Sequence, residues 1–560
     1  MTLPWVKQYD PGVPAEIGPV SGTIPQLLLR AAQKSPRAPA LAFFGRTMSY
    51  GTLAEQTARL AQALRNLGVA PGERVAFLLP NCPQLVMVYL AALHLGAVAV
   101  PLNPLLSPKE LHYQLTDSGA RRLAVLDHLL PKVEVARAGT DLAQVVVTSL
   151  ADYLPWPLNW LYPLKARRQG QAVGFKAASG CLAWRELIQS PPLETPPLPD
   201  PGDVAVLLYT GGTTGIPKAA ALTHGNLLAN VAQINAWLPQ VRYGEERLIG
   251  LLPFSHSFGL TVCLNWPISQ GALIIVLPRF ELGMFLKALK KHRPTMLPGV
   301  PTLFVALINH PEITRYDFTS LWACISGSAP LPLDVRDRFE GLTNCCILEG
   351  YGLTEAGPVT HINPIEGRRP PGSIGLPLPN TAVRIMDQQT GARELPLGEV
   401  GELILKGPQV MQGYWQKDEE TDLALRDGWL YTGDLARMEA DGYFYIVERK
   451  KDMIISGGYN IYPREVEEVL YQHPGVKEAV ALGWPDDYRG EVVKVVIVSR
   501  DGLPLTAEEL RDFCRPQLAA YKVPKIIEFR PELPKSQVGK VLRRVLREEW
   551  TSTLSAPGKS

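Results

Sequence analysis

The sequence predicts an α/β protein with a large N-terminal body, a small β subdomain and a smaller C-terminal α+β domain. Strand-like and helix-like segments alternate from residue 49 to residue 127, which is typical of parallel sheets covered on both faces. After Pro370 the chain changes to short alternating β segments with frequent glycine, and beyond five consecutive charged residues at 448–452 helices and strands mix again. The length of 560 residues agrees with roughly three or four domain-sized units.

Each element is predicted by its own local signal. Helices are indicated by apolar residues at near-helical spacing, by a proline at the first turn or by a capping box. Strands are indicated by short apolar runs between turn signals. The predicted helices are 49–68, 83–95, one opening at the capping box 107–110, 463–470 and one opening at 506–509, and the predicted strands are 75–79, 97–101, 122–127, 383–385, 402–405, 443–447, 479–482 and 492–498.

The composition excludes several classes of function. Charged residues make up 20% of the chain and the net charge is +2, so no global field attracts nucleic acid. The N-terminus lacks the charged-then-apolar pattern of a signal peptide. The longest apolar run, 85–102, is broken by His94, Gly96 and Pro101, and a spanning helix needs about 20 apolar residues. Seven cysteines without a C-x-x-C pair favour a reducing cytoplasm and predict neither a disulfide framework nor a zinc site.

The segment 153–168 interrupts the alternation with several prolines. It carries Trp156, Trp160 and Tyr162 beside the cations Lys165, Arg167 and Arg168. Amphipathic aromatic residues next to basic ones are typical of a membrane surface. The alternative is a proline-rich surface excursion that packs on its own domain. The sequence leaves both interpretations open.

A glycine-rich stretch, Tyr209-Thr-Gly-Gly-Thr-Thr-Gly-Ile-Pro-Lys218, is the centre of the body. Its backbone N–H groups, hydroxyls and lysine suit the oxygens of a polyphosphate. The P-loop of kinases does not fit, because Pro217 stands where that motif needs glycine and Ala219 where it needs a hydroxyl. An ordinary flexible turn remains the other interpretation.

Two turns, 324–330 and 349–355, each end a predicted strand and are candidate nucleotide contacts, because ligands of open α/β sheets bind beyond the carboxyl ends of strands. Two further stretches are 253–259, which places His256 among aromatic residues, and 431–434, which places an acid in a predicted tight turn. Tyr351 could stack on a base, Glu355 could hold Mg²⁺ and Asp434 could accept ribose hydroxyls. Taken one at a time, they are equally a core histidine, turn signals and solvated acids. The charged run 448–452 predicts an exposed joint between domains, and Lys540 follows a glycine near the end of the chain.

These motifs, in this order, resemble those of the adenylate-forming enzymes, which include acyl- and aryl-CoA synthetases, firefly luciferase and the adenylation domains of peptide synthetases. The resemblance covers about residues 25 to 547 and is greatest to bacterial long-chain fatty acid-CoA ligases. One departure is Ala219, where many members have glycine, and we expect it to be tolerated. The matching motifs are the stretch 209–218, Gly-Tyr-Gly-Leu-Thr-Glu355, Tyr-Thr-Gly-Asp434, Glu-Arg-Lys-Lys-Asp452, Ser-Gly-Gly-Tyr-Asn460 and Pro-Lys-Ser-Gln-Val-Gly-Lys540.

The resemblance implies a fold and a reaction. The body, 1–450, would hold two doubly wound sheets and the β subdomain, Lys451 would be a hinge, and 452–560 would be a mobile domain with the catalytic lysine. A fatty acid, ATP and CoA would give acyl-CoA, AMP and pyrophosphate, with Mg²⁺ as cofactor. Contact with the inner face of the membrane and a homodimer are compatible with the sequence, which does not specify the acyl chain length.

The resemblance also assigns residues to roles. Thr210, Gly211, Gly212, Thr213, Thr214, Gly215 and Lys218 would bind the β- and γ-phosphates, and Thr354 and Glu355 would contact phosphate and Mg²⁺. Gly327, Ser328, Ala329, Gly350, Tyr351 and Gly352 would enclose adenine, and Asp434 and Arg449 would bind ribose. Lys540 would bridge the carboxylate and the α-phosphate, Gly457, Gly458 and Tyr459 would lie beside the pantetheine arm of CoA, and His256 would line the acyl pocket.

Three rival functions remain. Two are enzymes: a ligase for aryl or medium-chain acids, and a ligase that loads acyl-AMP onto a carrier protein. The third is an inactive lipid-responsive binding protein with the same fold. A binding module has no need for all of Lys218, Glu355, Asp434, Arg449 and Lys540, so their joint presence argues against the third.

Overall fold

The computed structural model describes residues 3–168, 180–195, 197, 199–210, 217–388, 390–456, 459–486, 489–500, 505–536, 539 and 541–554. The chain forms two compact units. The first consists of Met1–Ala382 and Lys406–Gly428, and the second of Val383–Leu405 and Trp429–Ser560. The small β subdomain therefore groups with the C-terminal elements, whereas the sequence assigned it to the body. The hinge at Lys451 stays a prediction.

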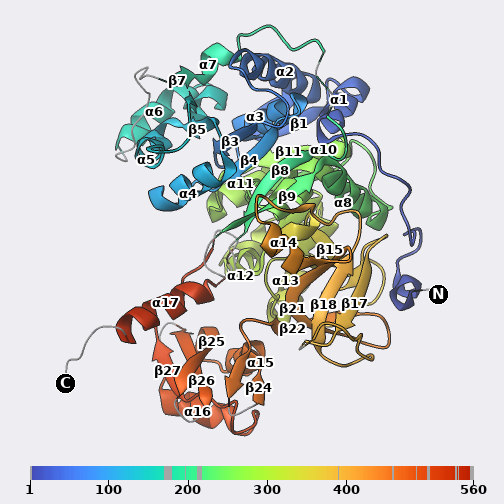
Figure 1. The fold of residues 1–560 in the computed structure, drawn as a ribbon, viewed down its shortest axis with the longest axis vertical. Helices are drawn as coiled ribbons and strands as arrows, with labels where there is room; N and C mark the ends of the chain where they lie inside the picture. Colours follow the sequence, from blue (N-terminus) through green and yellow to red (C-terminus); the bar gives the residue numbers. More distant parts are fainter. Residues whose placement is uncertain are drawn as a thin grey trace. The chain divides into compact units, whose positions relative to one another are not determined.

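A nine-stranded sheet in the first unit places the candidate ligand turns (Figure 1). Its strand order is β16-β15-β14-β13-β12-β10-β11-β1-β2. The strands from β14 to β1 in this order run parallel, and antiparallel strands flank them at both edges. The strands are β1 (Pro39–Phe43), β2 (Arg46–Ser49), β10 (Arg247–Gly250), β11 (Leu273–Val276), β12 (Met296–Gly299), β13 (Ala323–Ser326), β14 (Cys346–Gly352), β15 (Val359–Ile362) and β16 (Leu376–Pro377).

An eight-stranded sheet of the same unit carries the glycine-rich stretch. Its order is β19-β9-β8-β4-β3-β5-β6-β7. The strand β9 pairs antiparallel with β8, so residues 211–216 connect the two strands of a hairpin. The sequence did not predict β9, because its alanines have low strand propensity. The strands are β3 (Arg74–Leu78), β4 (Val98–Leu102), β5 (Arg122–Leu126), β6 (Gln144–Thr148), β7 (Cys181–Ala183), β8 (Val204–Thr210), β9 (Lys218–Thr223) and β19 (Gly413–Tyr414).

Helices cover both faces of these sheets, as the alternation predicted (Figure 1). The apolar run at 85–102 became α3, which is buried along its whole length, followed by the buried β4. The capping box Ser107/Glu110 opens α4 as predicted. The helices are η1 (Pro4–Gln8), α1 (Ile24–Lys34), α2 (Tyr50–Asn66), α3 (Pro83–His94), α4 (Pro108–Ser118), η2 (Asp127–Leu129), α5 (Leu130–Ala136), η3 (Leu150–Tyr153), α6 (Leu158–Arg168), α7 (Trp184–Leu187), α8 (His224–Trp237), α9 (Ser257–Leu260), the π-helical η4 (Thr261–Asn265), α10 (Trp266–Ser269), α11 (Leu282–His292), α12 (Pro301–Ile308), η5 (Ile313–Arg315), α13 (Leu333–Thr343), η6 (Thr354–Ala356) and α14 (Asp418–Ala424).

Most strands of two five-stranded sheets belong to the second unit, although β20 of one sheet falls in the segment Lys406–Gly428 of the first unit. One is the predicted β subdomain, with β17 (Ala382–Met386), β18 (Gly401–Lys406), β20 (Leu425–Arg426), β21 (Trp429–Met438) and β22 (Phe444–Arg449). The other is the predicted α+β domain, in which α15 (Pro463–Tyr471) and α16 (Ala507–Cys514) contribute to one apolar core with the sheet. Its remaining elements are β23 (Ile454–Ser456), β24 (Tyr459–Ile461), β25 (Val476–Asp486), β26 (Gly490–Ser499), β27 (Ile526–Phe529) and α17 (Arg543–Leu554).

Two local expectations were wrong. The stretch 431–434 is not a tight turn, because it lies inside β21, where Gly433 has a φ of +69° beside an irregularity in strand pairing. The charged run 448–452 is not wholly exposed, since Glu448 and Asp452 are only 5% and 6% exposed. Both carboxylates are paired with arginines of α17. A carboxylate that gains a charged partner can be buried, and residue type alone does not show that partner.

The sequence predicted neither a disulfide framework nor a membrane-spanning helix. All seven cysteines are free thiols. Within the described ranges, no helix is both long enough and apolar enough to cross a membrane. The proline-rich segment 153–168 contains the 11-residue helix α6, which has Pro163 in its interior.

Candidate active site

Three candidate turns follow strands of the nine-stranded sheet. His256 follows β10, Gly327 follows β13, and Glu355 follows β14. Because β13 and β14 are parallel neighbours, Ser326 lies opposite Glu349, and the turns leave the sheet at the same edge. The predicted turns 324–330 and 349–355 thus lie beyond the carboxyl ends of neighbouring strands, and their contact with a ligand stays a prediction.

These turns contact one another. A Cβ atom at Gly327 would lie 3.0 Å from the ring of Phe258 and 3.7 Å from the carbonyl oxygen of Gly350. The hydroxyls of Ser257 and Thr354 are 3.2 Å apart. The turn that contains His256 thus packs against both of the other turns, although up to about a hundred residues separate them in the chain.

The ring of Tyr351 packs against a buried histidine. It pairs across β14 and β15 with His361, and the two rings meet edge to face with centroids 5.8 Å apart. Burial lowers the pKa of His361 to about 3, so this ring is neutral at physiological pH. Tyr351 itself is half-buried. A ring fixed on one side and partly exposed is suited to stacking on a base.

Gly350 and Gly352 flank Tyr351 in the chain, and Gly327 lies near the carbonyl oxygen of Gly350. A Cβ atom at Gly352 would lie 2.2 Å from the carbonyl oxygen of Pro358, so this position excludes a side chain. Ser328 has a φ of +70° and adopts the left-handed conformation despite its side chain. Ala329 continues that turn after Ser328.

The glycine-rich stretch is described only at its ends. Gly211, Gly212, Thr213, Thr214 and Gly215 lie outside the described residues. Thr210 and Lys218 are opposite each other at the ends of β8 and β9. The hydroxyl of Tyr113 donates to the carbonyl of Pro217 at 3.0 Å and anchors the second strand. A polyphosphate would meet Lys218 at the end of this hairpin.

Lys218 and Glu355 share a neighbour that the sequence analysis did not find. The ammonium of Lys218 lies 5.3 Å from the ring centroid of Tyr414 and 3.9 Å from Oε1 of Glu420. The hydroxyl of Tyr414 donates to Oε1 of Glu355 at 2.8 Å. Tyr414 belongs to a two-residue strand with no detectable period, so no sequence signal distinguished it.

Glu355 fits a magnesium ligand that is completed by substrate phosphates. Among the described residues it accepts a side-chain hydrogen bond on Oε1, and Oε2 has none. The described part of the chain contains no group of three or more acidic, histidine or cysteine side chains arranged to hold a metal. Mg²⁺ commonly binds through one or two carboxylates together with phosphates and water, so a single carboxylate is sufficient.

His256 has a structural role within its turn. Its Nδ1 accepts a hydrogen bond from the backbone N–H of Phe258 at 3.2 Å and caps α9. The side chain is half-buried. Its role at an acyl pocket stays a prediction.

In the second unit the predicted ribose ligands are paired. Asp434 and Arg449 are opposite each other on β21 and β22, and Arg449 Nε lies 2.6 Å from Asp434 Oδ1. Tyr459 is 59% exposed and stacks on Tyr521 with ring centroids 4.6 Å apart. Lys451 is exposed. Gly457, Gly458 and Lys540 lie outside the described residues.

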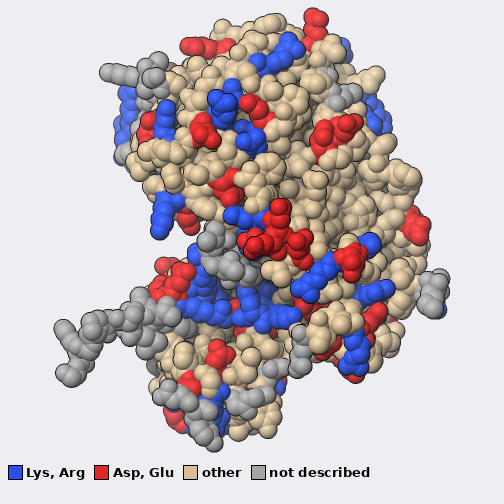
Figure 2. All heavy atoms as spheres, in the orientation of Figure 1, with Lys and Arg blue, Asp and Glu red and all other residues tan. Residues whose placement is uncertain are grey.

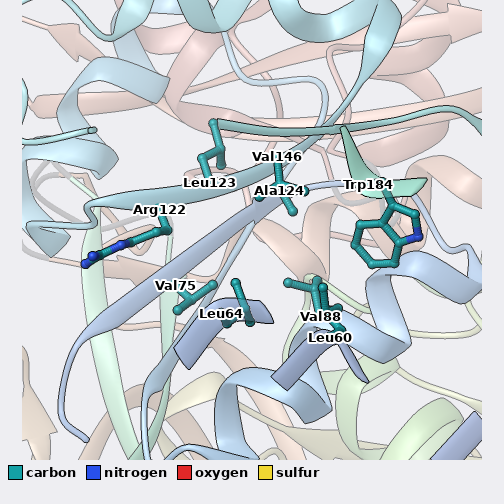
Figure 3. A pocket seen from close by; sticks show the side chains of 9 residues that line it. All are labelled: Leu60, Leu64, Val75, Val88, Arg122, Leu123, Ala124, Val146 and Trp184. Atoms are coloured by element: carbon teal, nitrogen blue, oxygen red, sulfur yellow. The ribbon is translucent and has the colours of Figure 1, made fainter. Parts of the chain in front are cut away.

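The pocket drawn in Figure 3 is a gap in the core and not a substrate site. Leu60 and Leu64 of α2, Val88 of α3 and Trp184 of α7 line it, and it leaves no room for a water molecule. Arg122 lies at its rim, and its guanidinium is paired with Glu73 at 2.6 Å. None of the candidate site residues lines it.

Comparison with known proteins agrees with this geometry. Residues 28–415 match the AMP-binding enzyme family, and residues 465–540 match the AMP-binding enzyme C-terminal domain. The chain is 46% identical to a long-chain-fatty-acid–CoA ligase of Bacillus subtilis over 551 residues, which cover 98% of both chains. It is 38% identical to a feruloyl-CoA synthase of Amycolatopsis over 93% of this chain and 98% of that protein. The ATP-bound MatB of Rhodopseudomonas palustris has the same fold, with a TM-score of 0.81 and 31% identity over 94% of this chain and 99% of MatB. The chain therefore belongs to the AMP-binding, adenylate-forming enzyme family.

Proposed function

We propose that this protein is an AMP-forming long-chain fatty acid-CoA ligase. The observation that carries the proposal is an arrangement in the first unit. The turns after β10, β13 and β14 pack against one another, and Tyr414 contacts both Lys218 and Glu355. The 46% identity to a ligase named for long-chain fatty acids supports the substrate class.

In the first step a fatty acid carboxylate attacks the α-phosphate of ATP. A carboxylate oxygen–phosphorus bond forms, the bond between the α-phosphorus and its bridging oxygen breaks, and pyrophosphate leaves. Because two anions must approach each other, cations and fixed N–H donors have to offset their repulsion. Lys218 and residues 210–215 would bind the β- and γ-phosphates, and Lys540 would bridge the carboxylate and the α-phosphate.

By the family resemblance, separate groups of residues would hold the nucleotide and the metal. Gly327, Ser328, Ala329 and the glycines beside Tyr351 would enclose adenine, and Asp434 with Arg449 would receive the ribose hydroxyls. Thr354 and Glu355 would hold Mg²⁺ against the phosphates. When bound, Mg²⁺ offsets phosphate charge.

In the second step the thiol of CoA attacks the acyl carbonyl, a thioester forms and AMP leaves. Lys451 would act as the hinge that withdraws Lys540 and brings Gly457, Gly458 and Tyr459 beside the pantetheine arm. The exposed ring of Tyr459 and its glycine neighbours suit close approach of a ligand. His256 would line the acyl pocket.

The test measures pyrophosphate and AMP release with Mg-ATP and CoA across acids from acetate to oleate, with benzoate and coumarate added. We expect maximal release with long alkyl chains, and acyl-CoA as product. Release with aryl acids alone would assign the protein to the aryl ligases, which the feruloyl-CoA synthase relative makes the main rival. Pyrophosphate release without transfer to CoA would indicate a carrier-loading ligase, and no release with any acid would favour the binding protein.

We further propose that α6 brings this enzyme to the cytoplasmic face of the membrane. Trp156 and Trp160 are 84% and 70% exposed, and Leu161 and Leu164 continue an exposed apolar face at helical spacing. Arg167 and Arg168 end the helix, and Figure 2 shows Lys and Arg side chains at the edge of the first unit where Figure 1 places α5 and α6. Aromatic residues beside cations suit an anionic lipid surface.

Tyr162 is less exposed than the two tryptophans. It is half-buried, and burial and the charge of Asp127 raise its pKa. Its contact with the membrane stays a prediction.

Sedimentation with phosphatidylglycerol vesicles tests the membrane proposal. We expect Trp156→Ala with Trp160→Ala to reduce binding to the vesicles several-fold, since each exposed ring contributes apolar area. Leu342→Ser is the matched control, because Leu342 is 42% exposed in the same unit and lies on α13, which Figure 1 draws away from α6. Equal loss in both proteins, or no loss in either, would overturn the proposal.

A further inference from the structure

Tyr414 lies at the point where the phosphate-binding and metal-binding residues of the first unit meet. Its strand β19 is the edge strand beside β9, which begins at Lys218. Its hydroxyl reaches Glu355 and its ring lies near Lys218. One side chain therefore contacts the two groups that would bind the charged end of ATP.

The hydroxyl fixes the orientation of a carboxylate. Tyr414 donates to Oε1 of Glu355 at 2.8 Å. Two residues before β19, the backbone N–H of Met411 donates to the carbonyl of Glu355, also at 2.8 Å. Glu355 is thus held at its backbone and at one side-chain oxygen by the same short segment.

The ring offers Lys218 a neutral partner. A lysine ammonium within about 6 Å of an aromatic centroid is attracted to the ring face, and here the distance is 5.3 Å. The nearest carboxylate, that of Glu420, lies at 3.9 Å from the ammonium and is partly exposed. An aromatic partner orients the lysine without neutralising the charge that a phosphate needs.

The position of Tyr414 is itself rigid. It pairs with Ala220 of β9, its N–H donates to Thr421 Oγ1 at 2.9 Å, and the N–H of Trp415 donates to the carbonyl of Ala219 at 2.8 Å. A side chain on such a backbone loses little entropy when it orients a neighbour.

We propose that Tyr414 is a positioning residue for the adenylation step, which orients Glu355 through its hydroxyl and Lys218 through its ring. The proposal rests on the proposed function for the identity of the ligand, Mg-ATP. Because the hydroxyl and the ring of Tyr414 make different contacts, one substitution can remove the hydroxyl alone and another can remove both groups.

The test compares Tyr414→Phe, which removes the hydroxyl, with Tyr414→Leu, which removes hydroxyl and ring. We expect Tyr414→Phe to weaken Mg-ATP binding about tenfold, as for other residues that hold a metal ligand, and Mn²⁺ to restore part of the loss. Tyr414→Leu should weaken binding about threefold more, because it also removes the half-buried cation–π contact with Lys218. Calorimetry measures binding directly, and steady-state KM for Mg-ATP measures it in turnover.

Tyr50→Phe is the matched control. It also removes a hydrogen-bonded tyrosine hydroxyl from the first unit, where Tyr50 donates to the carbonyl of Ala272 at 2.7 Å. This control should lower the melting temperature and leave Mg-ATP binding unchanged. Conversion of supplied acyl-AMP to acyl-CoA should be the same in Tyr414→Phe and wild type, because that step does not use the triphosphate.

Two outcomes would overturn the inference. One is wild-type affinity for Mg-ATP in Tyr414→Phe, and the other is an equal loss in the adenylation and acyl-AMP-fed reactions, which indicates a purely structural role. Wild-type protein that binds Mg-ATP more tightly than Tyr414→Phe but activates no acid would contradict the proposed function alone.

Discussion

Lys218 of the first unit and Arg543 of the second show two ways in which this chain uses a cation. Lys218 has a ring at 5.3 Å and one carboxylate at 3.9 Å. Arg543 lies within 2.9 Å of Glu448, 2.6 Å of Glu467 and 3.5 Å of Asp452. Lys218, for which we propose a phosphate-binding role, is lightly paired, whereas Arg543 is fully paired with carboxylates of its own unit.

The physical reason is the cost of burying charge. Glu448, Asp452 and Glu467 are all largely removed from solvent, and a buried carboxylate needs a paired cation and hydrogen bonds. Burial raises the pKa of Glu467, and Arg543 opposes that rise. Burial alone would lower the pKa of Arg543, but the three carboxylates raise it. We therefore expect substitution of Arg543 to reduce stability and substitution of Lys218 to reduce activity.

The largest expected effect is on stability at Arg543. Arg543→Ala would leave buried carboxylates without their partner and destabilise the second unit by about 3–5 kcal/mol. Denaturant unfolding measures this loss. The neighbouring Arg544→Ala is the control, since Arg544 pairs on the exposed surface with Glu548 and should cost less than about 1 kcal/mol. Equal losses in both variants would contradict the assignment of Arg543 to a structural role.

The second effect is on activity at Lys218. Lys218→Ala should lower adenylation about a hundredfold, as does the loss of a group that stabilises developing charge. The free energy of unfolding should change by less than about 1 kcal/mol, because the ion pair of Lys218 with Glu420 is long and partly exposed. Pyrophosphate release and thermal unfolding are measured on the same sample. A large loss of stability with unchanged turnover would reverse the comparison between the two cations.

The third effect is on acid stability, which should differ between the units. Burial lowers the pKa of His94 and His224 to about 4 and that of His361 to about 3, and all three belong to the first unit. Because the unfolded chain binds protons near pH 6.5 and the folded state does not, stability is present above pH 6.5 and falls as the pH decreases. Each histidine would contribute a loss of about 2 kcal/mol between pH 6.5 and pH 5.

Thermal unfolding between pH 7 and pH 5 checks this dependence. His94→Asn should make the decrease shallower, since one titrating group is removed. Stability that rises toward pH 5 would have the opposite sign and would show that these histidines are protonated in the folded protein.

The smallest effect is at Glu420. Glu420→Gln removes the carboxylate beside Lys218, with which a phosphate would compete. We expect Mg-ATP to bind about two- to threefold more tightly at low salt, and the difference to shrink as salt screens the charge. Calorimetry at two salt concentrations measures it. Weaker binding in the variant would mean that Glu420 orients Lys218 for the phosphate.

Local signals were sufficient for much of the fold. The capping boxes at Ser107 and Thr506 open α4 and α16 as predicted, and the apolar run at 85–102 forms a buried helix and strand. These signals work because caps and periodicity act within one or two turns of the chain. The strand β9 was missed because its alanines pack well at an inner position but have no strand preference of their own.

The site could be predicted in part. Gly327, Thr354 and Glu355 follow β13 and β14, as the strand-end rule predicted, and Tyr351 lies in the last residues of β14, while their contacts with a ligand stay predictions. Tyr414 and Glu420 could not be found in this way. They enter the site through the pairing of β19 with β9, which joins residues almost two hundred positions apart.

The residue types and their order along the chain were thus enough to assign the α/β class, the family resemblance and the candidate ligands, because these depend on local spacing. Tertiary structure decided which charged side chains are fully paired within the protein and which could still pair with a ligand. Glu448 and Asp452 read as an exposed joint in the sequence and are buried against Arg543 and Arg547. Pairing between distant residues sets the environment of a charge, and that environment determines whether it supports the fold or binds a ligand.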